Sequence, residues 1–304
     1  MRSPIIVLLT CCSIIAFIIT ITLVSMVCGI LWWNRITCPS IEFMKSKGFK
    51  FDKRDKLSLY SVWKEIYLDH EYDEVLRDLA PDPVIVDVGA NIGLFAARCT
   101  ELCKNPTVYC YEPVPEIFSL LHYNAKIMDG NIKPYPVGVG DRNYSTTIQY
   151  FPRASAMSTG CDDTDEKFEV GIVHQVKNYT TSPILTPILS ALFRLYINTK
   201  LQPEKVQIRI ESFTKILSNI KGEIDLVKID CECCELSAVK ALSAKDLARI
   251  NTVFIEVENY RTNWQQEITE IFEKNNFKVR IENESKSWCD IIANRIKVSY
   301  STKN

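Results

Sequence analysis

The stretch Val84–Phe95, VIVDVGANIGLF, decides the fold of this chain. It begins with three apolar residues after two nearby prolines, a pattern typical of a buried parallel strand. Asp87 closes the strand, Gly89 and Gly93 bracket a turn, and a segment with helical apolar spacing follows. The order strand, glycine-rich turn, helix predicts an α/β domain. Such a turn suits a ligand, because glycines leave room for it and the helix start offers unpaired N–H groups.

The spacing of the glycines separates two kinds of cofactor. A dinucleotide fingerprint has the pattern G-x-G-x-x-G, whereas this turn has the pattern Asp87-x-Gly89-x-x-x-Gly93. The spacing argues against NAD and so disfavours a nicotinamide oxidoreductase. It resembles the S-adenosylmethionine turn of Rossmann-like methyltransferases. For this motif alone, an ordinary strand-to-helix turn is the alternative.

An acidic residue follows the next predicted strand. Thr107–Tyr111 (TVYCY) is typical of a strand, and Glu112 comes directly after it. In nucleoside-binding sheets an acid at this place, about twenty residues past the glycines, accepts hydrogen bonds from ribose hydroxyls. Glu112 lies 19 residues after Gly93. The two motifs together are more specific than either alone, because they define two strand tips that meet at one crevice.

A second group of acids follows the strand predicted within IDLVKIDCECCEL, residues 224–236. Asp230 stands at the carboxyl end of this strand, where open α/β sheets place their ligands. Asp230 and Glu232 are therefore candidates to orient an acceptor hydroxyl or to take its proton. Two alternatives stay open: the acids could hold a divalent metal, or Glu232 and Glu235 could only favour the start of the next helix. We assign no residue to a metal.

These motifs together resemble the FkbM-type methyltransferases, a family of S-adenosylmethionine-dependent O-methyltransferases. The resemblance rests on scattered blocks: VDVGANIG (86–93), YEPVPEIFSLLHYNA (111–125), PVGVGD (136–141), LVKIDCECCE (226–235), VFIEVEN (253–259) and WCDIIANR (288–295). It implies a Rossmann-like class I methyltransferase sheet with helices on both faces and an antiparallel last strand. It also implies S-adenosyl-L-methionine as the cofactor and a hydroxyl of a small molecule, glycan or lipid-linked molecule as the acceptor.

The resemblance also implies roles for single residues in the cofactor site. The cofactor turn would consist of Asp87, Gly89, Ala90, Asn91 and Gly93. Glu112 would hold the ribose. Asp141, just past the third-strand region PVGVGD, would lie near the adenine, with a role in a turn as the equal alternative.

For the acceptor side, Asp230, Glu232 and Glu256 are the predicted catalytic residues. Glu256 lies near the end of the strand predicted at TVFIEVE, residues 252–258, and matches a family glutamate that could line the acceptor pocket. A solvent-facing acid at a strand end is the alternative for it. The chain departs from the family pattern at Cys233, which replaces a glycine.

The amino-terminal part has a different character. Residues 5–33 carry no charge and are long enough to span a bilayer, and the run exceeds the apolar core of a cleaved signal peptide. We expect a signal anchor or transmembrane helix at 1–34, a linker and helices at 35–80, the methyltransferase domain at 81–298 and a tail at 299–304. The helices at 57–79 are expected to pack on the sheet rather than to bind substrate.

These boundaries describe a single-pass membrane protein of the endomembrane system or the plasma membrane. Cations cluster after the apolar run, which leans toward a cytosolic domain, but long domains can be translocated regardless of charge. The side of the membrane stays open. The net charge of −1 shows no basic footprint, so a nucleic-acid partner is excluded.

The cysteines predict no special chemistry. Nine of the twelve lie outside the apolar segment, and an odd number fits no complete disulfide framework. Cys231 and Cys234 are half a zinc site without a second pair or a nearby histidine. We therefore predict small buried thiols.

The sequence as a whole predicts a membrane-anchored O-methyltransferase. The rival is a catalytically inactive, membrane-tethered interaction protein that keeps the same fold. The complete cofactor turn favours the enzyme, and Cys233 favours the rival.

Overall fold

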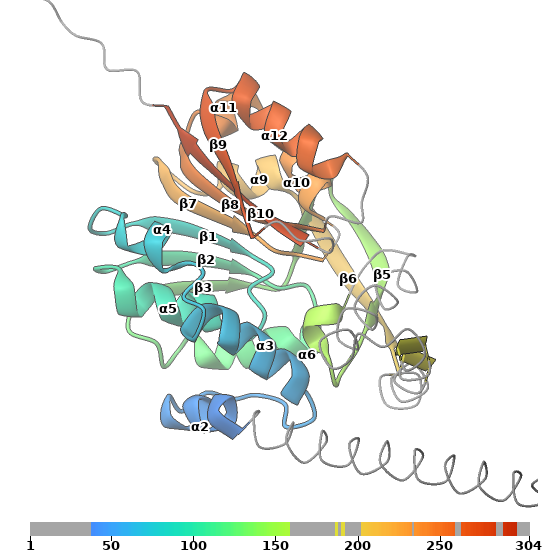
Figure 1. Cartoon of the computed structure of the whole chain (residues 1–304). Coiled ribbons are helices and arrows are strands. Elements are labelled where there is room, and N and C mark those ends of the chain that lie inside the picture. The colour runs from blue at the N-terminus through green and yellow to red at the C-terminus, as the bar shows by residue number, and fades with distance from the viewer. Residues whose placement is uncertain are drawn as a thin grey trace, which may run out of the picture.

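Seven strands form one central sheet in the computed structural model (Figure 1). They are β1 (Val84–Val88), β2 (Thr107–Tyr111), β3 (Asn131–Tyr135), β7 (Ile224–Ile229), β8 (Ile250–Glu258), β9 (Phe277–Glu282) and β10 (Trp288–Arg295). Their order across the sheet is β3-β2-β1-β7-β8-β10-β9. The pairs from β3 to β8 are parallel, and β10 is antiparallel to both of its neighbours. The expected Rossmann-like sheet with an antiparallel last strand is confirmed.

The structure describes residues 38–158, 186–187, 190–191, 202–232, 234–258, 263–283 and 288–296. The predicted membrane anchor at 1–34 and the tail at 299–304 lie outside these residues. Within the described ranges, no helix combines the length and the apolar character needed to cross a bilayer.

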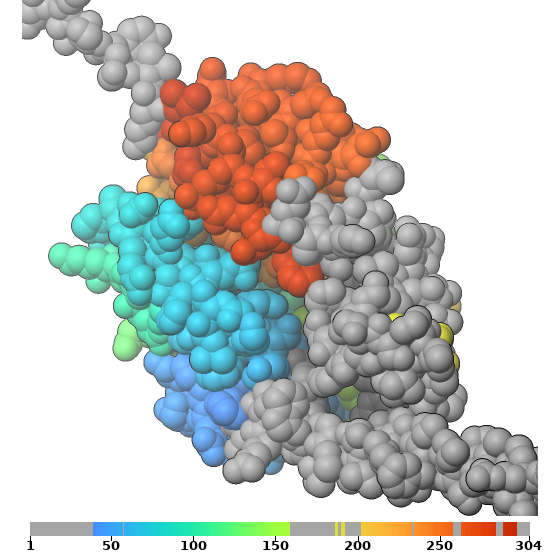
Figure 2. Space-filling model, viewed as in Figure 1, coloured from blue at the N-terminus to red at the C-terminus, as the bar shows by residue number. Residues whose placement is uncertain are grey.

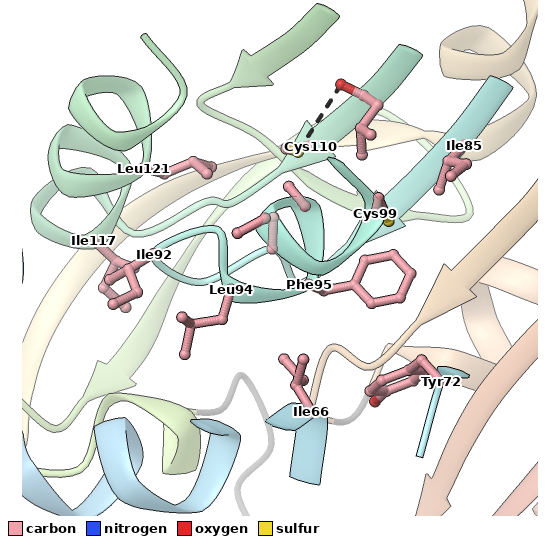
Figure 3. Packing of buried hydrophobic residues seen from close by; sticks show 14 of the residues in the cluster. Ile66, Tyr72, Ile85, Ile92, Leu94, Phe95, Cys99, Cys110, Ile117 and Leu121 are labelled. Carbon is pink, nitrogen blue, oxygen red and sulfur yellow. Dashed lines mark hydrogen bonds between the residues drawn. The ribbon is translucent and has the colours of Figure 1, made fainter. Parts of the chain in front are cut away.

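Helices cover both faces of the sheet, because the inner strands are apolar on both sides. One face carries α5 (Leu94–Leu102) and α6 (Pro115–Asn124), and the other carries α9 (Phe213–Ser218), α10 (Glu235–Ala241), α11 (Ala244–Leu247) and α12 (Trp264–Lys274). Successive residues of β1 face opposite sides of the sheet. Ile85 packs in the core on the side of α5, and Val86 packs in the core on the side of α9. In Figure 3, α5 lies between Ile85 and the residues Ile66 and Tyr72.

Among the described residues, three helices precede the sheet, where a linker and one or two helices were predicted. They are α2 (Cys38–Ser46), α3 (Lys56–Tyr67) and α4 (Asp73–Arg77). Each contributes fully or nearly fully buried side chains to the same core as α5, among them Met44, Ile66 and Leu76. The amino-terminal segment and the sheet therefore share one apolar core.

Tyr72, which precedes α4, connects this segment to the centre of the sheet. Its ring centroid lies 5.0 Å from that of Phe95 on α5 and 4.8 Å from that of Phe254 on β8. At the surface, Arg280 of β9 donates a hydrogen bond of 2.9 Å to Glu74 of α4. The cyan surface of the amino-terminal part accordingly meets the orange surface of the carboxyl-terminal part (Figure 2). This segment thus closes one side of the sheet.

A smaller sheet corrects one prediction. It has the order β4-β6-β5 and consists of β4 (Gly138–Gly140), β5 (Tyr144–Tyr150) and β6 (Glu204–Ser212). PVGVGD therefore supplies β4 of this sheet, and the third strand of the main sheet is β3, with the sequence NIKPY. Pro134 is tolerated there because β3 is an edge strand. Gly138 suits β4, since a Cβ atom would lie 2.6 Å from Ile210 of β6.

Candidate functional site

The glycine turn joins the tips of three strands. The N–H groups of Gly89 and Ala90 both donate to the carbonyl of Tyr111 at the end of β2, at 3.0 and 3.1 Å. Gly89 has a φ of +81°, and a Cβ atom on it would lie 1.8 Å from the carbonyl oxygen of Asp230 after β7. Gly89 therefore makes room for neighbouring protein backbone, whereas the sequence suggested room for a ligand.

Gly93 also has a structural role. It is the N-cap of α5 with a φ of +95°, and a Cβ atom would approach Leu121 and Met128 to 3.0 Å. It does not line the cavity described below. Its lack of a side chain allows α5 to pack closely against α6 and the segment after it.

Glu112 lies where the sequence placed it, beside the turn. Its carboxylate accepts hydrogen bonds from the backbone N–H of Asn91 at 3.1 Å and of Val114 at 2.9 Å. Glu112 is only 5% exposed. Burial raises the pKa of its carboxyl to about 7, although the two backbone hydrogen bonds act in the opposite direction. Each oxygen still has a lone pair for a ligand.

A cavity of about 400 Å³ opens at this end of the sheet. Its walls come from the turns after β1, β2 and β7, from α3, from η1 (Ser155–Met157) and from the small sheet. Of the predicted site residues, it brings together Gly89, Ala90, Asn91, Glu112, Asp230, Glu232 and Glu256. Asp87, Gly93 and Asp141 do not line it.

Asp87 is fully buried below the turn, where its counter-charge is Lys228. The Lys228 Nζ lies 3.7 Å from Asp87 Oδ1 and 3.0 Å from Asp230 Oδ2. Burial raises the pKa of Asp87 to about 6, and Lys228 opposes this rise. Burial alone would lower the pKa of Lys228, but Asp230 and Asp87 together raise it above its ordinary value. Asp87 therefore supports the site from beneath, through an ion pair.

Asp141 does not reach the cavity. It follows β4 in the turn to β5, its side chain is about half exposed, and its carboxylate pairs with Arg142 at 3.0 Å. The placement beside an adenine is therefore not supported, and the alternative of a turn residue fits the structure. The expectation failed because PVGVGD belongs to the small sheet and does not supply the third strand of the main sheet.

The prediction of free thiols after β7 is wrong. Cys231 and Cys234 form a disulfide, and both line the cavity. Cys233 lies outside the described residues. Its neighbour Glu232 has a φ of +54°, a left-handed conformation that is uncommon for a residue other than glycine. A loop of four residues closed by a disulfide can hold such a conformation.

Glu235 has the structural role that was one of the alternatives for the acids of this loop. It is 1% exposed at the first position of α10, and its Oε1 accepts a long hydrogen bond of 3.4 Å from the Cys231 N–H. The carboxylate thus fastens the loop to the start of the helix.

Three functional candidates were missed or undervalued. Lys228 was visible as a single lysine in an apolar strand. Glu65 of α3 and Glu71 after it carried no local signal, because charges spaced along a helix usually face solvent. Glu65 lines the cavity and accepts a hydrogen bond of 3.2 Å from Ser61. Helix α3, which was expected only to pack on the sheet, therefore also contributes polar side chains to the cavity wall.

The acids at this wall and Glu71 beside it repel one another. Burial, reinforced by Asp230, raises the pKa of Glu65 to about 7. Burial, reinforced first by Asp290, raises the pKa of Glu71 to about 8. The pKa of Glu256 is raised well above its ordinary value by burial and by Asp230. The carboxyl groups of Glu65 and Glu71 can therefore hold and release protons near neutral pH.

We predict that Gly89→Ala destabilises the fold by roughly 2–5 kcal/mol, through left-handed backbone strain and the clash with the Asp230 carbonyl. Gly222→Ala is the matched control, because Gly222 has a similar φ of +83° but a Cβ atom there would have no neighbour within 4 Å. Urea unfolding of the purified protein measures both. Equal losses in the two variants would contradict the close approach of Asp230 to the turn.

Comparison with known proteins identifies relatives of this chain. The methyltransferase FkbM domain matches residues 87–279. The AMB antimetabolite synthetase AmbE of Pseudomonas aeruginosa is 25% identical over 201 residues, which cover 66% of this chain and 10% of AmbE. Methyltransferase 1 of Beauveria bassiana is 22% identical over 228 residues, 75% of this chain and 84% of the relative.

A third relative is the 31-O-demethyl-FK506 methyltransferase FkbM of Streptomyces tacrolimicus, which is 27% identical over 203 residues, 65% of this chain and 74% of the relative. The chain thus spans a tenth of AmbE and most of the other two proteins. Because the FkbM domain covers more than half of it, the chain belongs to the FkbM methyltransferase family and is an S-adenosylmethionine-dependent methyltransferase.

Proposed function

We propose that this protein transfers a methyl group to a hydroxyl, with S-adenosyl-L-methionine held between the tips of β1 and β2. The observation that carries the proposal is the contact between the two tips. The Glu112 carboxylate lies 3.1 Å from the Asn91 nitrogen in the glycine turn, and both residues line one cavity. A carboxylate that can accept hydrogen bonds from ribose hydroxyls and a glycine turn therefore line the same cavity.

The cavity fits such a cofactor in size and in charge. A volume of about 400 Å³ lies within the range of pockets that hold small molecules and cofactors. Its lining contains the acids Glu65, Glu112, Asp230, Glu232 and Glu256. Lys228 is the only lysine or arginine among the described lining residues, and it already pairs with Asp230. Such a lining favours a ligand with positive charge.

The chain's acids suit the transfer. When bound, S-adenosylmethionine supplies a methyl group on a positively charged sulfur. Glu65 is the base that takes the hydroxyl proton, because a pKa of about 7 matches neutral conditions. Asp230 is held by Lys228 and orients the acceptor. Glu256 lines the same cavity, and burial together with Asp230 raises its pKa well above its ordinary value.

The class of acceptor is inferred from a relative and from the amino terminus. The name of the Streptomyces tacrolimicus relative assigns its methyl group to an oxygen. We infer that this chain also methylates a hydroxyl, on a small molecule, a glycan or a lipid-linked molecule. The apolar run at residues 5–33 supports an anchor in the endomembrane system or the plasma membrane, which would bring the site close to lipid-linked acceptors.

A membrane-tethered protein that lost turnover remains the second candidate, and the reason is the replacement of the family glycine by Cys233. Binding of the cofactor alone does not separate the two candidates. Transfer of a labelled methyl group from the cofactor to a molecule in a membrane extract separates the two candidates. Identification of the labelled product would name the acceptor.

Glu112→Gln should weaken S-adenosylmethionine binding by about 10–100-fold at pH 8, because it removes hydrogen bonds to a charged group. Glu112 has a pKa raised to about 7, so protonation removes the ionised acceptor as the pH falls below 7. Wild-type affinity should therefore fall more steeply from pH 8 to 6 than that of the variant. Calorimetry on the full chain in mild detergent measures both.

The control for this experiment is Glu273→Gln, which changes an exposed glutamate on α12. It should bind as the wild type does. If the wild-type chain binds no S-adenosylmethionine, the proposed function fails. If Glu112→Gln binds as tightly as the wild type, the ribose contact fails while the activity stands.

Glu65→Gln should lower methyl transfer by about 100-fold or more while cofactor affinity stays within a factor of about two, since only the proton acceptor is lost. Incorporation of labelled methyl groups into a membrane extract measures transfer, with Glu273→Gln as the control. Full transfer by Glu65→Gln would assign the base to another carboxylate.

The disulfide supports a domain on the lumenal or extracellular side, because disulfides are rare in the cytosol. We predict that Cys231 and Cys234 in protein from intact cells resist alkylation after denaturation until a reductant is added. Mass spectrometry of peptides measures this. The free thiols of Cys99 and Cys110 are internal controls that react in both conditions. Alkylation of Cys231 and Cys234 without reductant would favour a cytosolic domain.

A further inference from the structure

Three carboxylates converge at the edge of the cavity, and no lysine or arginine of the described residues forms an ion pair with them. Glu71, Glu256 and Asp290 each place a carboxylate oxygen within 4.8 Å of the other two. Glu71 comes from the turn between α3 and α4, whereas Glu256 and Asp290 come from β8 and β10. The group therefore connects the amino-terminal segment to the far half of the sheet.

The sheet itself forces two of these acids together. Asp290 and Glu256 are directly opposite one another in the antiparallel pair of β10 and β8. Directly opposite residues share a face of the sheet, and like charges in such a pair destabilise it. Among the described residues, no lysine or arginine forms an ion pair with Glu71, Glu256 or Asp290. The buried cation Lys228 of β7 already pairs with Asp87 and Asp230.

Asp290 provides a second, independent observation. It is 1% exposed, and its Oδ2 accepts a hydrogen bond of 2.6 Å from Asn283. Its Oδ1 is buried and has no hydrogen-bond partner within the described part of the chain. A buried carboxylate oxygen without a partner is costly. The Asn283 contact orients the carboxylate in the way that an outer hydrogen bond orients a metal ligand.

We propose that Glu71, Glu256 and Asp290 bind a hard divalent cation, Ca²⁺ or Mg²⁺. Both ions take oxygen ligands, at 2.3–2.6 Å for Ca²⁺ and 2.0–2.1 Å for Mg²⁺. Two oxygens bound to one ion are therefore at most about 5 Å apart for Ca²⁺ and about 4 Å apart for Mg²⁺. Carboxylate oxygens within 4.8 Å of one another thus suit Ca²⁺ as they stand and Mg²⁺ after a small approach. Three protein ligands leave positions for water or for a ligand oxygen.

The position of the site gives it a use in the reaction. Glu256 also lines the cavity, so a cation bound to it lies at the cavity wall. There it can bind an oxygen of the acceptor and hold the hydroxyl toward Glu65. This use rests on the proposed function, whereas the binding of the cation does not.

The test measures binding of the metal alone. The full chain in mild detergent is stripped with a chelator, dialysed and titrated by calorimetry with CaCl₂ or MgCl₂, and its melting temperature is recorded with and without the metal. We expect one ion per chain and a higher melting temperature for the bound form. Absence of both heat and a melting shift with either metal at millimolar concentration would overturn the proposal.

Asp290→Asn and Glu256→Gln should weaken binding at least tenfold and remove the melting shift. Each variant also removes a repelling charge, so without metal it should melt at or above the temperature of stripped wild type. This pattern separates lost binding from failed folding. The control is Glu282→Gln, opposite Asp290 on β9 but paired with Arg280 at 3.1 Å. It should bind metal normally.

Binding by Asp290→Asn equal to that of wild type would overturn the assignment of the ligands. S-adenosylmethionine binding, measured on the same stripped samples without metal, keeps the two proposals apart. Metal binding without cofactor binding would support the cation site and reject the proposed function. Cofactor binding without metal binding would support the proposed function and reject the cation site.

Discussion

A buried ammonium group holds the ligand-binding end of the sheet together. Lys228 is 4% exposed, and its Nζ lies between Asp230 at 3.0 Å and Asp87 at 3.7 Å. Within the described chain, neither Asp87 oxygen has a hydrogen-bond partner, so this ion pair is what compensates its burial. Loss of one partner of a buried pair costs about 3–5 kcal/mol. The rings of Tyr72 and Phe95, 5.8 and 5.6 Å from Nζ, close the site from the amino-terminal side.

The chemistry of the cavity follows from this use of Lys228. Because Asp87 and Asp230 already balance the charge of Lys228, this lysine only weakly lowers the pKa values of the other acids that line the cavity. Glu65, Glu112 and Glu256 all have raised pKa values for the same reason, namely burial among other carboxylates. A lining with this excess of acid favours ligands that bring positive charge over anions such as phosphate chains.

Sequence could predict those parts of the site that depend on neighbours in the chain. The tips of β1, β2 and β7 carry local signals, because a strand end, a glycine turn and an acid lie within a few residues. Glu112 and Asp230 were therefore found. Asp141 was misplaced because an apolar, glycine-rich stretch does not reveal which of two sheets it joins. Glu65 could not be found, since its importance depends on how α3 packs against strands distant in the sequence.

The cysteine pair shows a different limit. An odd number of cysteines outside the apolar segment argued against a disulfide framework, but it says nothing about one local pair. Cys231 and Cys234 have a Cα–Cα distance of 5.6 Å in the turn before α10, which is within the range of disulfides. The short loop between β7 and α10, and not the total count, decides whether they pair.

The electrostatics of the cavity also bear on whether the chain is an enzyme or only a scaffold. A protein that kept the fold for binding other proteins would gain stability from neutral residues in place of Glu65, Glu112 and Glu256, since each is held in a buried, mutually repelling position. Strained charges of this kind accumulate at functional sites, where they are retained at a cost in stability. Their presence around one cavity, beside a complete glycine turn, favours a site that still binds and transforms a ligand.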